Sequence, residues 1–251
     1  MPIFHARDDE QGVRQKGDGS PVTLADEAAE AVILRMLVDA GVPRSTIVAE
    51  EAVSGGDMPD TSGDFYLVDP LDGTKEFVSG SGEFTVNIAR VEGGVPVSGV
   101  VFVPAKGMLY AGDAAGAWKA AVADGAIGER TPIAAATPGA KLSVVASKSH
   151  LTQETKDFVD RYPVESFVSS GSSLKFCRLA EGGADLYPRM GRTMEWDTGA
   201  GHAVLLAAGG QVYTLDGAPL AYGKISGDTF ANPHFVAAGA FDPFAVQLAA
   251  S

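Results

Sequence analysis

The chain has 251 residues, of which 45% are hydrophobic and 20% charged, a composition typical of a globular protein rather than a disordered one. Its 32 acidic and 19 basic residues give a formal net charge of −13. This charge argues against non-specific nucleic-acid binding, which needs a basic surface. It would also repel a phosphorylated substrate unless metal ions or a local basic cluster reverse the field at the site.

Cysteine usage and hydropathy point to an intracellular protein. Cys177 is the only cysteine, which excludes an internal disulfide and a zinc site made of several cysteines. The stretch 1–8 lacks the apolar core of a signal peptide, and no later stretch approaches the roughly 18 apolar residues of a membrane span. We therefore expect a cytoplasmic protein with no membrane partner.

The first half of the chain predicts one helix followed by β-structure. After a polar stretch, 1–22, Thr23 is expected to cap a helix that ends at Gly41. Asp26 lies in its first turn, where it either complements the helix dipole alone or also serves a site. Short apolar runs predict strands that lead directly into acidic residues at 47–49 and 65–68. Further β-rich runs predict an antiparallel sheet and cover 84–91, 97–103, 108–111 and 117–119.

The second half alternates strands with helices, as an α/β lobe does. The expected strands are 142–146 and 164–168, and the expected helices are 153–162 and 174–181. Another helix opens at Trp196, and its Val204, Leu205 and Ala208 are expected to reach the core. The Ala- and Pro-rich stretch 134–140 suggests a boundary between lobes 1–138 and 139–251, which form one compact unit.

The segment 65–77, FYLVDPLDGTKEF, places two carboxylates at the exit of a strand. Pro70 removes a backbone donor, and Gly73 allows a ligand to approach the backbone closely. Carboxylate oxygens suit a hard dication such as Mg²⁺, and the amides of Gly73 and Thr74 suit an anion if a helix starts there. Asp-Gly is also a common structural turn. An EF-hand is excluded because Thr74 and Gly80 stand where that loop needs Gly and Glu.

A set of separated segments carries one common pattern: DGSPVTLAD (18–26), AEE (49–51), DPLDGTKEF (69–77), GEFTVNIA (82–89), GSSLKFC (171–177), YPR (187–189) and WDTGAGH (196–202). Together they resemble the magnesium-dependent, lithium-sensitive inositol monophosphatase superfamily, most closely its bacterial 3'(2'),5'-bisphosphate nucleotidases. Ordered acids that lie far apart are more specific than any single motif. The resemblance implies a mixed α/β (α+β) chain with the layered αβαβα sugar-phosphatase fold.

The resemblance also implies a site with two or three Mg²⁺ ions that Li⁺ inhibits. Its metal ligands would be Glu50, Asp69, the Leu71 carbonyl, Asp72 and Asp197. Glu50 would belong to the catalytic set together with Thr74 and Asp26. In that set Thr74, oriented by Asp26, would position or deprotonate the attacking water.

The substrate is expected to be an adenosine bisphosphate. Lys75-Glu76-Phe77 resembles the nucleotidase branch, whereas inositol monophosphatases usually carry Thr and Asn before the Phe. The residues implied in substrate binding are Gly73, Thr74, His150, Ser172, Ser173, Lys175, Arg189 and Asp197. Arg189 can bind a second phosphate through two hydrogen bonds, and Lys175 would act as a point charge. Either residue could also be an ordinary solvated or paired charge.

We therefore expect an enzyme, a monomer or homodimer, that hydrolyses 3'-phosphoadenosine 5'-phosphate to AMP and phosphate and clears a by-product of sulfate assimilation. The alternatives are an inositol or fructose-bisphosphate phosphatase, or a dual enzyme, because the metal core is common to the superfamily. A nucleotide-binding module without catalysis is the alternative from another class. Relatives carry an amphipathic helix before the DGSPVT segment, where this chain has about 17 polar residues; we expect this difference to affect stability more than chemistry.

Overall fold

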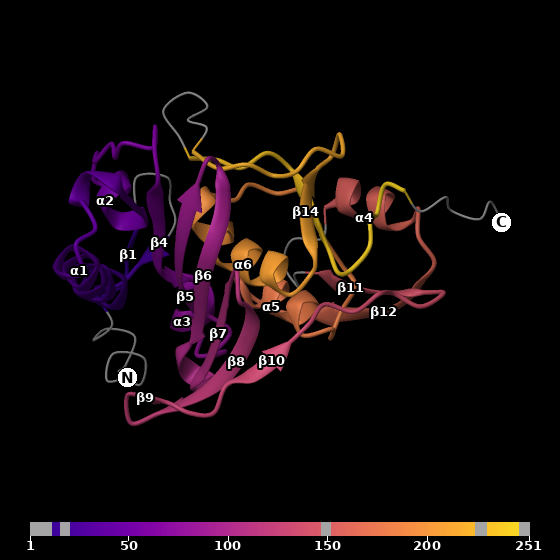
Figure 1. The fold of residues 1–251 in the computed structure, drawn as a ribbon, viewed down its shortest axis with the longest axis horizontal. Helices are drawn as coiled ribbons and strands as arrows, with labels where there is room; N and C mark the ends of the chain where they lie inside the picture. Colours follow the sequence, from indigo (N-terminus) through magenta and orange to yellow (C-terminus); the bar gives the residue numbers. More distant parts are fainter. Residues whose placement is uncertain (1–11, 16–20, 147–151, 224–229, 246–251) are drawn as a thin grey trace.

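The computed structural model describes residues 12–15, 21–146, 152–223 and 230–245 (Figure 1). His150, the stretch 18–20 and most of the segment that would hold a first helix lie outside the described residues. The helices are α1 (Leu24–Asp39), α2 (Glu50–Ser54), α3 (Thr74–Val78), α4 (Gln153–Val159), α5 (Leu174–Ala180) and α6 (Glu195–Ala207). None of these helices has the length and apolar character needed to span a bilayer.

The strands form two main sheets and one short hairpin. They are β1 (Arg14–Gln15), β2 (Pro21–Val22), β3 (Ile47–Ala49), β4 (Phe65–Asp72), β5 (Thr85–Glu92), β6 (Val95–Val103), β7 (Met108–Asp113), β8 (Gly116–Ala123), β9 (Ala126–Ile127), β10 (Thr131–Ile133), β11 (Leu142–Ala146), β12 (Val164–Ser169), β13 (Leu186–Arg189), β14 (Gln211–Thr214) and β15 (Phe235–Ala238).

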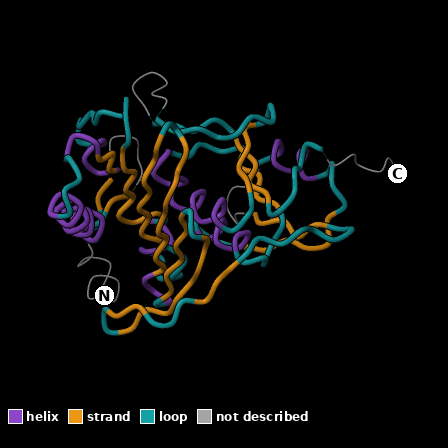
Figure 2. Tube along the Cα trace, in the orientation of Figure 1, coloured by secondary structure: helices purple, strands orange, loops and turns teal. Residues whose placement is uncertain are grey.

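Helices and sheets alternate in layers, as Figures 1 and 2 show. Helix α1 packs on β4 of the first sheet, and α6 covers β4 to β8 of the same sheet from the other side. Helix α5 lies against α6 and against β11, β13 and β15 of the second sheet, whose β13 also contacts α4. This order of layers confirms the predicted αβαβα architecture.

The first sheet has eight strands in the order β10-β8-β7-β6-β5-β4-β3, with β9 paired to β8. It is antiparallel, as predicted, except that β3 and β4 run parallel. The predicted end of the strand at Val68 is wrong, because β4 continues to Asp72. Pairing with β5 shifts register between Asp69 and Asp72. Pro70 falls within that irregularity, where its missing amide breaks no regular ladder bond.

The second sheet has five strands in the order β12-β11-β13-β15-β14. Strand β11 runs parallel to β12 and β13, whereas β13, β15 and β14 are antiparallel. The predicted α/β alternation therefore covers only β11, α4, β12 and α5. The first sheet is drawn from residues 47–133 and the second from 142–238.

Helix α6 occupies the layer between the two sheets (Figure 1). Val204 and Leu205 are fully buried and Ala208 is 7% exposed, which confirms their predicted place in the core. The helix backbone comes unusually close to the first sheet: a Cβ atom at Gly99 of β6 would lie 2.5 Å from the Ala200 carbonyl oxygen. Close packing of this kind holds the first turn of α6 at one position relative to the ends of β4 and β5.

Candidate active site

Asp26 connects the start of α1 with the start of α3. It is 1% exposed, and its Oδ2 accepts hydrogen bonds from the Thr23 amide at 2.8 Å and the Thr23 hydroxyl at 2.6 Å. Its Oδ1 accepts a hydrogen bond from Thr74 Oγ1 at 3.3 Å. The two roles that the sequence left open are therefore compatible, because one oxygen completes the capping box and the other holds Thr74.

The two carboxylates near the end of β4 lie on either side of its register shift, in a tightly hydrogen-bonded segment. Asp69 is 1% exposed, and its Oδ1 accepts a hydrogen bond from the Leu71 amide at 2.9 Å. Its Oδ2 is buried without a hydrogen-bond partner among the described residues. The Leu71 carbonyl is 3.5 Å from Thr74 Oγ1, so the end of β4, which carries both aspartates, also contacts the Asp26–Thr74 pair.

Ser172 and Ser173 of the loop before α5 connect the end of β4 with the first turn of α6. Ser172 Oγ lies 2.9 Å from both the Asp72 and Glu83 carbonyl oxygens, which share its single hydroxyl proton. The Ser173 amide donates to Asp72 Oδ2 at 2.7 Å, and its hydroxyl donates to the Asp197 carbonyl at 2.7 Å. Both hydroxyls are thus bonded to main-chain carbonyls, and the two serines hold Asp72 and Asp197 relative to each other.

Backbone geometry at this junction requires a glycine. Gly73 has a φ of 92°, and a Cβ atom there would lie 2.2 Å from Ser172 Oγ. Ser172 itself adopts a φ of 48°. Residues other than glycine rarely adopt a positive φ, and those that do are concentrated at functional sites. Any side chain at position 73 would separate the Ser172 loop from the end of β4, which carries Asp72.

The acids predicted as metal ligands influence one another strongly. Burial raises the pKa of Asp69 well above its usual value, and the charges of Glu50, Asp72 and Asp197 raise it further. The pKa of Asp197 rises for the same reasons, with burial first and then Asp72 and Glu50. Burial also raises the pKa of Asp72, which the charge of Lys175 opposes. The fold therefore gathers all of these carboxylates in one region.

This acidic region is suited to bind divalent cations, because its carboxylates are not neutralised by one another. Within the described ranges, no three His, Cys, Asp or Glu side chains are already arranged to hold one ion together. The carboxylates nevertheless repel one another, and Asp69 Oδ2 has no hydrogen-bond partner in the described part of the chain. A hard cation would relieve both the repulsion and the unsatisfied oxygen.

Glu50 begins α2 directly after β3, and a residue that the sequence analysis missed holds this turn. The Glu30 carboxylate of α1 accepts hydrogen bonds from the amides of Glu51 at 2.8 Å and Ala52 at 2.9 Å. Glu30 is 6% exposed, and burial raises its pKa. Its position one helical turn after Asp26, on the same face of α1, was the signal that could have found it.

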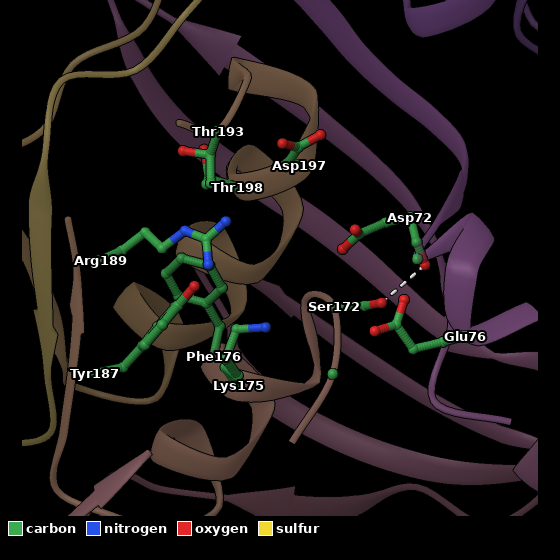
Figure 3. A pocket seen from close by; sticks show the side chains of 12 residues that line it. Asp72, Glu76, Ser172, Lys175, Phe176, Tyr187, Arg189, Thr193, Asp197 and Thr198 are labelled. Carbon is green, nitrogen blue, oxygen red and sulfur yellow. Dashed lines mark hydrogen bonds between the residues drawn. The ribbon is translucent and has the colours of Figure 1, made fainter. Parts of the chain in front are cut away.

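Asp72 and Asp197 line a pocket together with two basic side chains, Lys175 and Arg189, which lie across the pocket from them, as Figure 3 shows. Lys175 is 6% exposed, and its Nζ lies 5.4 Å from the centroid of the Tyr187 ring. Burial lowers the pKa of Lys175 to about 8, against the opposing charge of Asp72. Arg189 is half-buried and donates through Nη2 to the Arg192 carbonyl at 3.3 Å, while its Nε has no partner among the described residues.

Most of the predicted substrate-binding residues lie on the pocket wall. Those that do are Gly73, Ser172, Lys175, Arg189 and Asp197. Ser173 is buried behind the wall, with 1% exposure. The pocket also contains Glu76, Tyr187, Thr193 and Thr198, which we did not predict. All but Thr193 lie inside the segments quoted above, so proximity to a predicted ligand was the available signal.

Buried hydrogen bonds support the first turn of α6, which carries Asp197. Asp197 Oδ2 accepts from the Met194 amide at 2.8 Å. Thr198 Oγ1 accepts from Tyr222 at 3.1 Å and from Asn232 Nδ2 at 3.0 Å. His202 Nδ1 lies 3.0 Å from the Tyr222 hydroxyl, and burial lowers the pKa of His202 to about 3, which keeps the ring neutral.

Comparison with known proteins identifies the family. The model of the "Inositol monophosphatase family" matches residues 3–241. The 3'(2'),5'-bisphosphate nucleotidase CysQ of Escherichia coli (strain K12) is 42% identical over 226 residues, which cover 89% of this chain and 87% of that protein. Among solved structures, CysQ from Bacteroides thetaiotaomicron is 37% identical with a TM-score of 0.77, covering 96% of this chain and 91% of that one.

A more distant relative has the same fold. The inositol monophosphatase from Anabaena (Nostoc) is 28% identical with a TM-score of 0.68, covering 88% of this chain and 83% of that one. The family predicted from the motifs is thus confirmed by a match over almost the whole sequence and by superposition of the structures. The chain belongs to the inositol monophosphatase family.

Proposed function

We propose that the chain is a phosphatase that hydrolyses the 3'-phosphate of 3'-phosphoadenosine 5'-phosphate to give AMP and phosphate. The observation that carries this proposal is the pocket with two oppositely charged sides: Asp72 and Asp197 stand across from Lys175 and Arg189. A substrate with two phosphate groups needs two anion sites, one on metal ions and one on basic side chains. The names of the bacterial relatives point to the same substrate class.

The residues that would hold Mg²⁺ are Glu50, Asp69, the Leu71 carbonyl, Asp72 and Asp197. The mutually raised pKa values of Asp69 and Asp197 and the unpartnered, buried Asp69 Oδ2 support this assignment. When bound, two or three such ions would neutralise charge on the transferred phosphate and make a water molecule more acidic.

Thr74 and Asp26 would orient the attacking water. Because Thr74 Oγ1 donates its proton to Asp26 Oδ1, its lone pairs are left to accept a hydrogen bond from that water. Asp26 acts as an acceptor in every bond described for it, which keeps the Thr74 hydroxyl in one orientation. As the water oxygen bonds to phosphorus, the bond from phosphorus to the 3'-oxygen breaks.

The basic side of the pocket would hold the 5'-phosphate. Lys175 is almost fully buried, so its charge acts with little screening by solvent. The Arg189 Nε has no partner among the described residues and can take part in a bidentate hydrogen bond with a phosphate. We assign the main-chain amides of Gly73 and Thr74, at the start of α3, to the 3'-phosphate.

The test is phosphate release from adenosine 3',5'-bisphosphate, 3'-AMP, inositol 1-phosphate and fructose 1,6-bisphosphate, each with and without Mg²⁺. Arg189→Ala should lower kcat/KM for the adenosine bisphosphate by about ten- to a hundredfold, the effect of losing a charge-assisted contact. For 3'-AMP, which lacks the second phosphate, kcat/KM should hardly change. Arg90→Ala is the control, because Arg90 forms surface ion pairs with Asp64 and Glu92.

Other results would favour the other candidates. Inositol 1-phosphate or fructose bisphosphate as the best substrate would support a sugar phosphatase or a dual enzyme. Equal losses on both adenosine substrates would mean that Arg189 supports the fold or the metal site. Binding of the bisphosphate without any phosphate release would support a nucleotide-binding module.

The setting of the enzyme is also a proposal. We infer a cytoplasmic location, supported by the single cysteine, Cys177, which is fully buried and forms no disulfide. We further propose a monomer or homodimer, inhibition by Li⁺, and a role in clearing a by-product of sulfate assimilation, all of which follow from the family resemblance.

A further inference from the structure

A buried amide of unexplained purpose lies beside the acidic site. Asn87 of β5 is fully buried, and both polar atoms of its side chain, Nδ2 and Oδ1, have no hydrogen-bond partner among the described residues. Native proteins rarely bury an amide in this state, since its hydrogen bonds to water are lost on folding without replacement. A hydrophobic residue would fill the same place on the sheet at lower energetic cost, so the amide calls for a function.

The sheet register places this amide opposite a predicted metal ligand. Asn87 is paired directly with Asp69 across β4 and β5, and directly opposed residues project from the same face of a sheet. Asp69 Oδ2 is itself buried without a partner in the described part of the chain. An unused donor group and an unused carboxylate oxygen thus belong to neighbouring side chains.

The residues on either side of Asn87 connect it with the other two aspartates. Thr85, two residues earlier on the same face, lies 3.5 Å from Asp72 Oδ2 through its hydroxyl. Ala89, two residues later on the same face, is the closest part of β5 to Gly199, where a Cβ atom would lie 3.3 Å away. Gly199 is in the turn of α6 that carries Asp197. Asn87 therefore lies on β5 opposite Asp69, between a residue that contacts Asp72 and a residue that contacts the turn of α6 carrying Asp197.

We propose that Asn87 is a positioning residue of the acidic site, whose Nδ2 group donates a hydrogen bond to Asp69 when the site holds Mg²⁺ and whose Oδ1 accepts one from a water in the site. This inference rests on the proposed metal site. A hydrogen bond behind a ligating carboxylate restricts which of its lone pairs face the ion, and loss of such a contact typically weakens metal binding about 10- to 100-fold.

The experiment measures Mg²⁺ binding by calorimetry and by the Mg²⁺-induced rise in Tm, both independent of turnover. Asn87→Leu keeps the number and branching of the side-chain heavy atoms but has no polar atoms. We expect its metal-free Tm to equal or exceed that of the wild type, because an unsatisfied amide has been removed. Its Mg²⁺ dissociation constant should rise about 10- to 100-fold, and kcat/KM should recover at high Mg²⁺. Asn87→Ser, which retains a donor and an acceptor, should bind Mg²⁺ more tightly than Asn87→Leu.

Val91→Ala is the matched control, since Val91 is equally buried on the same face of β5. It should lower the metal-free Tm and leave the Mg²⁺ dissociation constant unchanged. Wild-type Mg²⁺ affinity in both Asn87 variants would overturn the inference while leaving the metal site intact. So would a fall in the metal-free Tm of Asn87→Leu as large as that of Val91→Ala, with unchanged Mg²⁺ affinity. No Mg²⁺ response in the wild type would instead overturn the metal site itself, and the inference with it.

Discussion

Replacing Gly99 by alanine should displace helix α6, although Gly99 itself does not line the pocket. The added Cβ atom would lie 2.5 Å from the Ala200 carbonyl oxygen and 3.0 Å from the Ala200 Cα atom. Neither backbone atom can rotate away, so we expect α6 to retreat from β6 by roughly 0.5–0.9 Å to restore contacts of 3.0–3.4 Å. Asp197 lies less than one turn before Ala200 and would move with the helix.

The displacement has two measurable effects. Overpacking of this size destabilises a protein by about 1–3 kcal/mol, which for a chain of this length lowers Tm by roughly 2–12 °C. A shift approaching 1 Å in a group that organises the reaction should lower kcat by about 10- to 100-fold. Thermal unfolding and steady-state kinetics on the adenosine bisphosphate at saturating Mg²⁺ measure the two effects separately.

Gly63→Ala is the control, because nothing lies within 4 Å of a Cβ atom at that position. It should leave both Tm and kcat unchanged. If Gly99→Ala showed the Tm and kcat of the wild type, α6 would not be held by backbone contact with the sheet. A fall in Tm with unchanged kcat would show that the sheet yields instead of the helix.

Three further outcomes follow from the site. Thr74→Ala should lower kcat by about a hundredfold or more with little change in KM. In steady-state kinetics, the double variant with Asp26→Asn should show losses that are not additive, because the two side chains act as a pair. Since the pKa of Lys175 is lowered to about 8, its charge is lost above that pH; KM for the bisphosphate, but not for 3'-AMP, should then rise in a pH profile. His202 takes up a proton below about pH 6.5 when unfolded but only near pH 3 when folded, so acid favours the unfolded state. Urea unfolding should show the wild type losing about 1.4 kcal/mol of stability per pH unit in this window relative to His202→Gln.

Local patterns were sufficient to predict much of the fold. Thr23 followed by Asp26 identified the start of α1. Apolar runs identified β4, which is buried on both faces, and β5, in which every second residue is buried. The short strands β13, β14 and β15 were missed, since each has only four residues and β13 contains Pro188. Their strand geometry depends on pairing with distant segments, which single-sequence periodicity does not contain.

The site shows the same division between local and distant information. The order of the acids was enough to nominate the carboxylates, but the Asp26–Thr74 contact joins residues 48 positions apart and could only be inherited from the family. Glu30 and Asn87 were missed because each lies within a regular element. Glu30 resembles any polar position of a helix, and Asn87 interrupts an alternation whose buried positions are otherwise read as core. Their roles depend on partners that only the folded chain provides.

The place of α6 in the chain has a consequence for biosynthesis. The strands that it covers, β4 to β8, emerge from the ribosome long before α6 is synthesised. Until then, the buried face of the first sheet, with Leu67, Ala89 and Val101, has no covering layer. We propose that lobes 1–138 and 139–251 are therefore a single folding unit. A chain stalled before α6 should bind chaperones through that face, and a fragment that ends at residue 138 should aggregate when expressed without the rest.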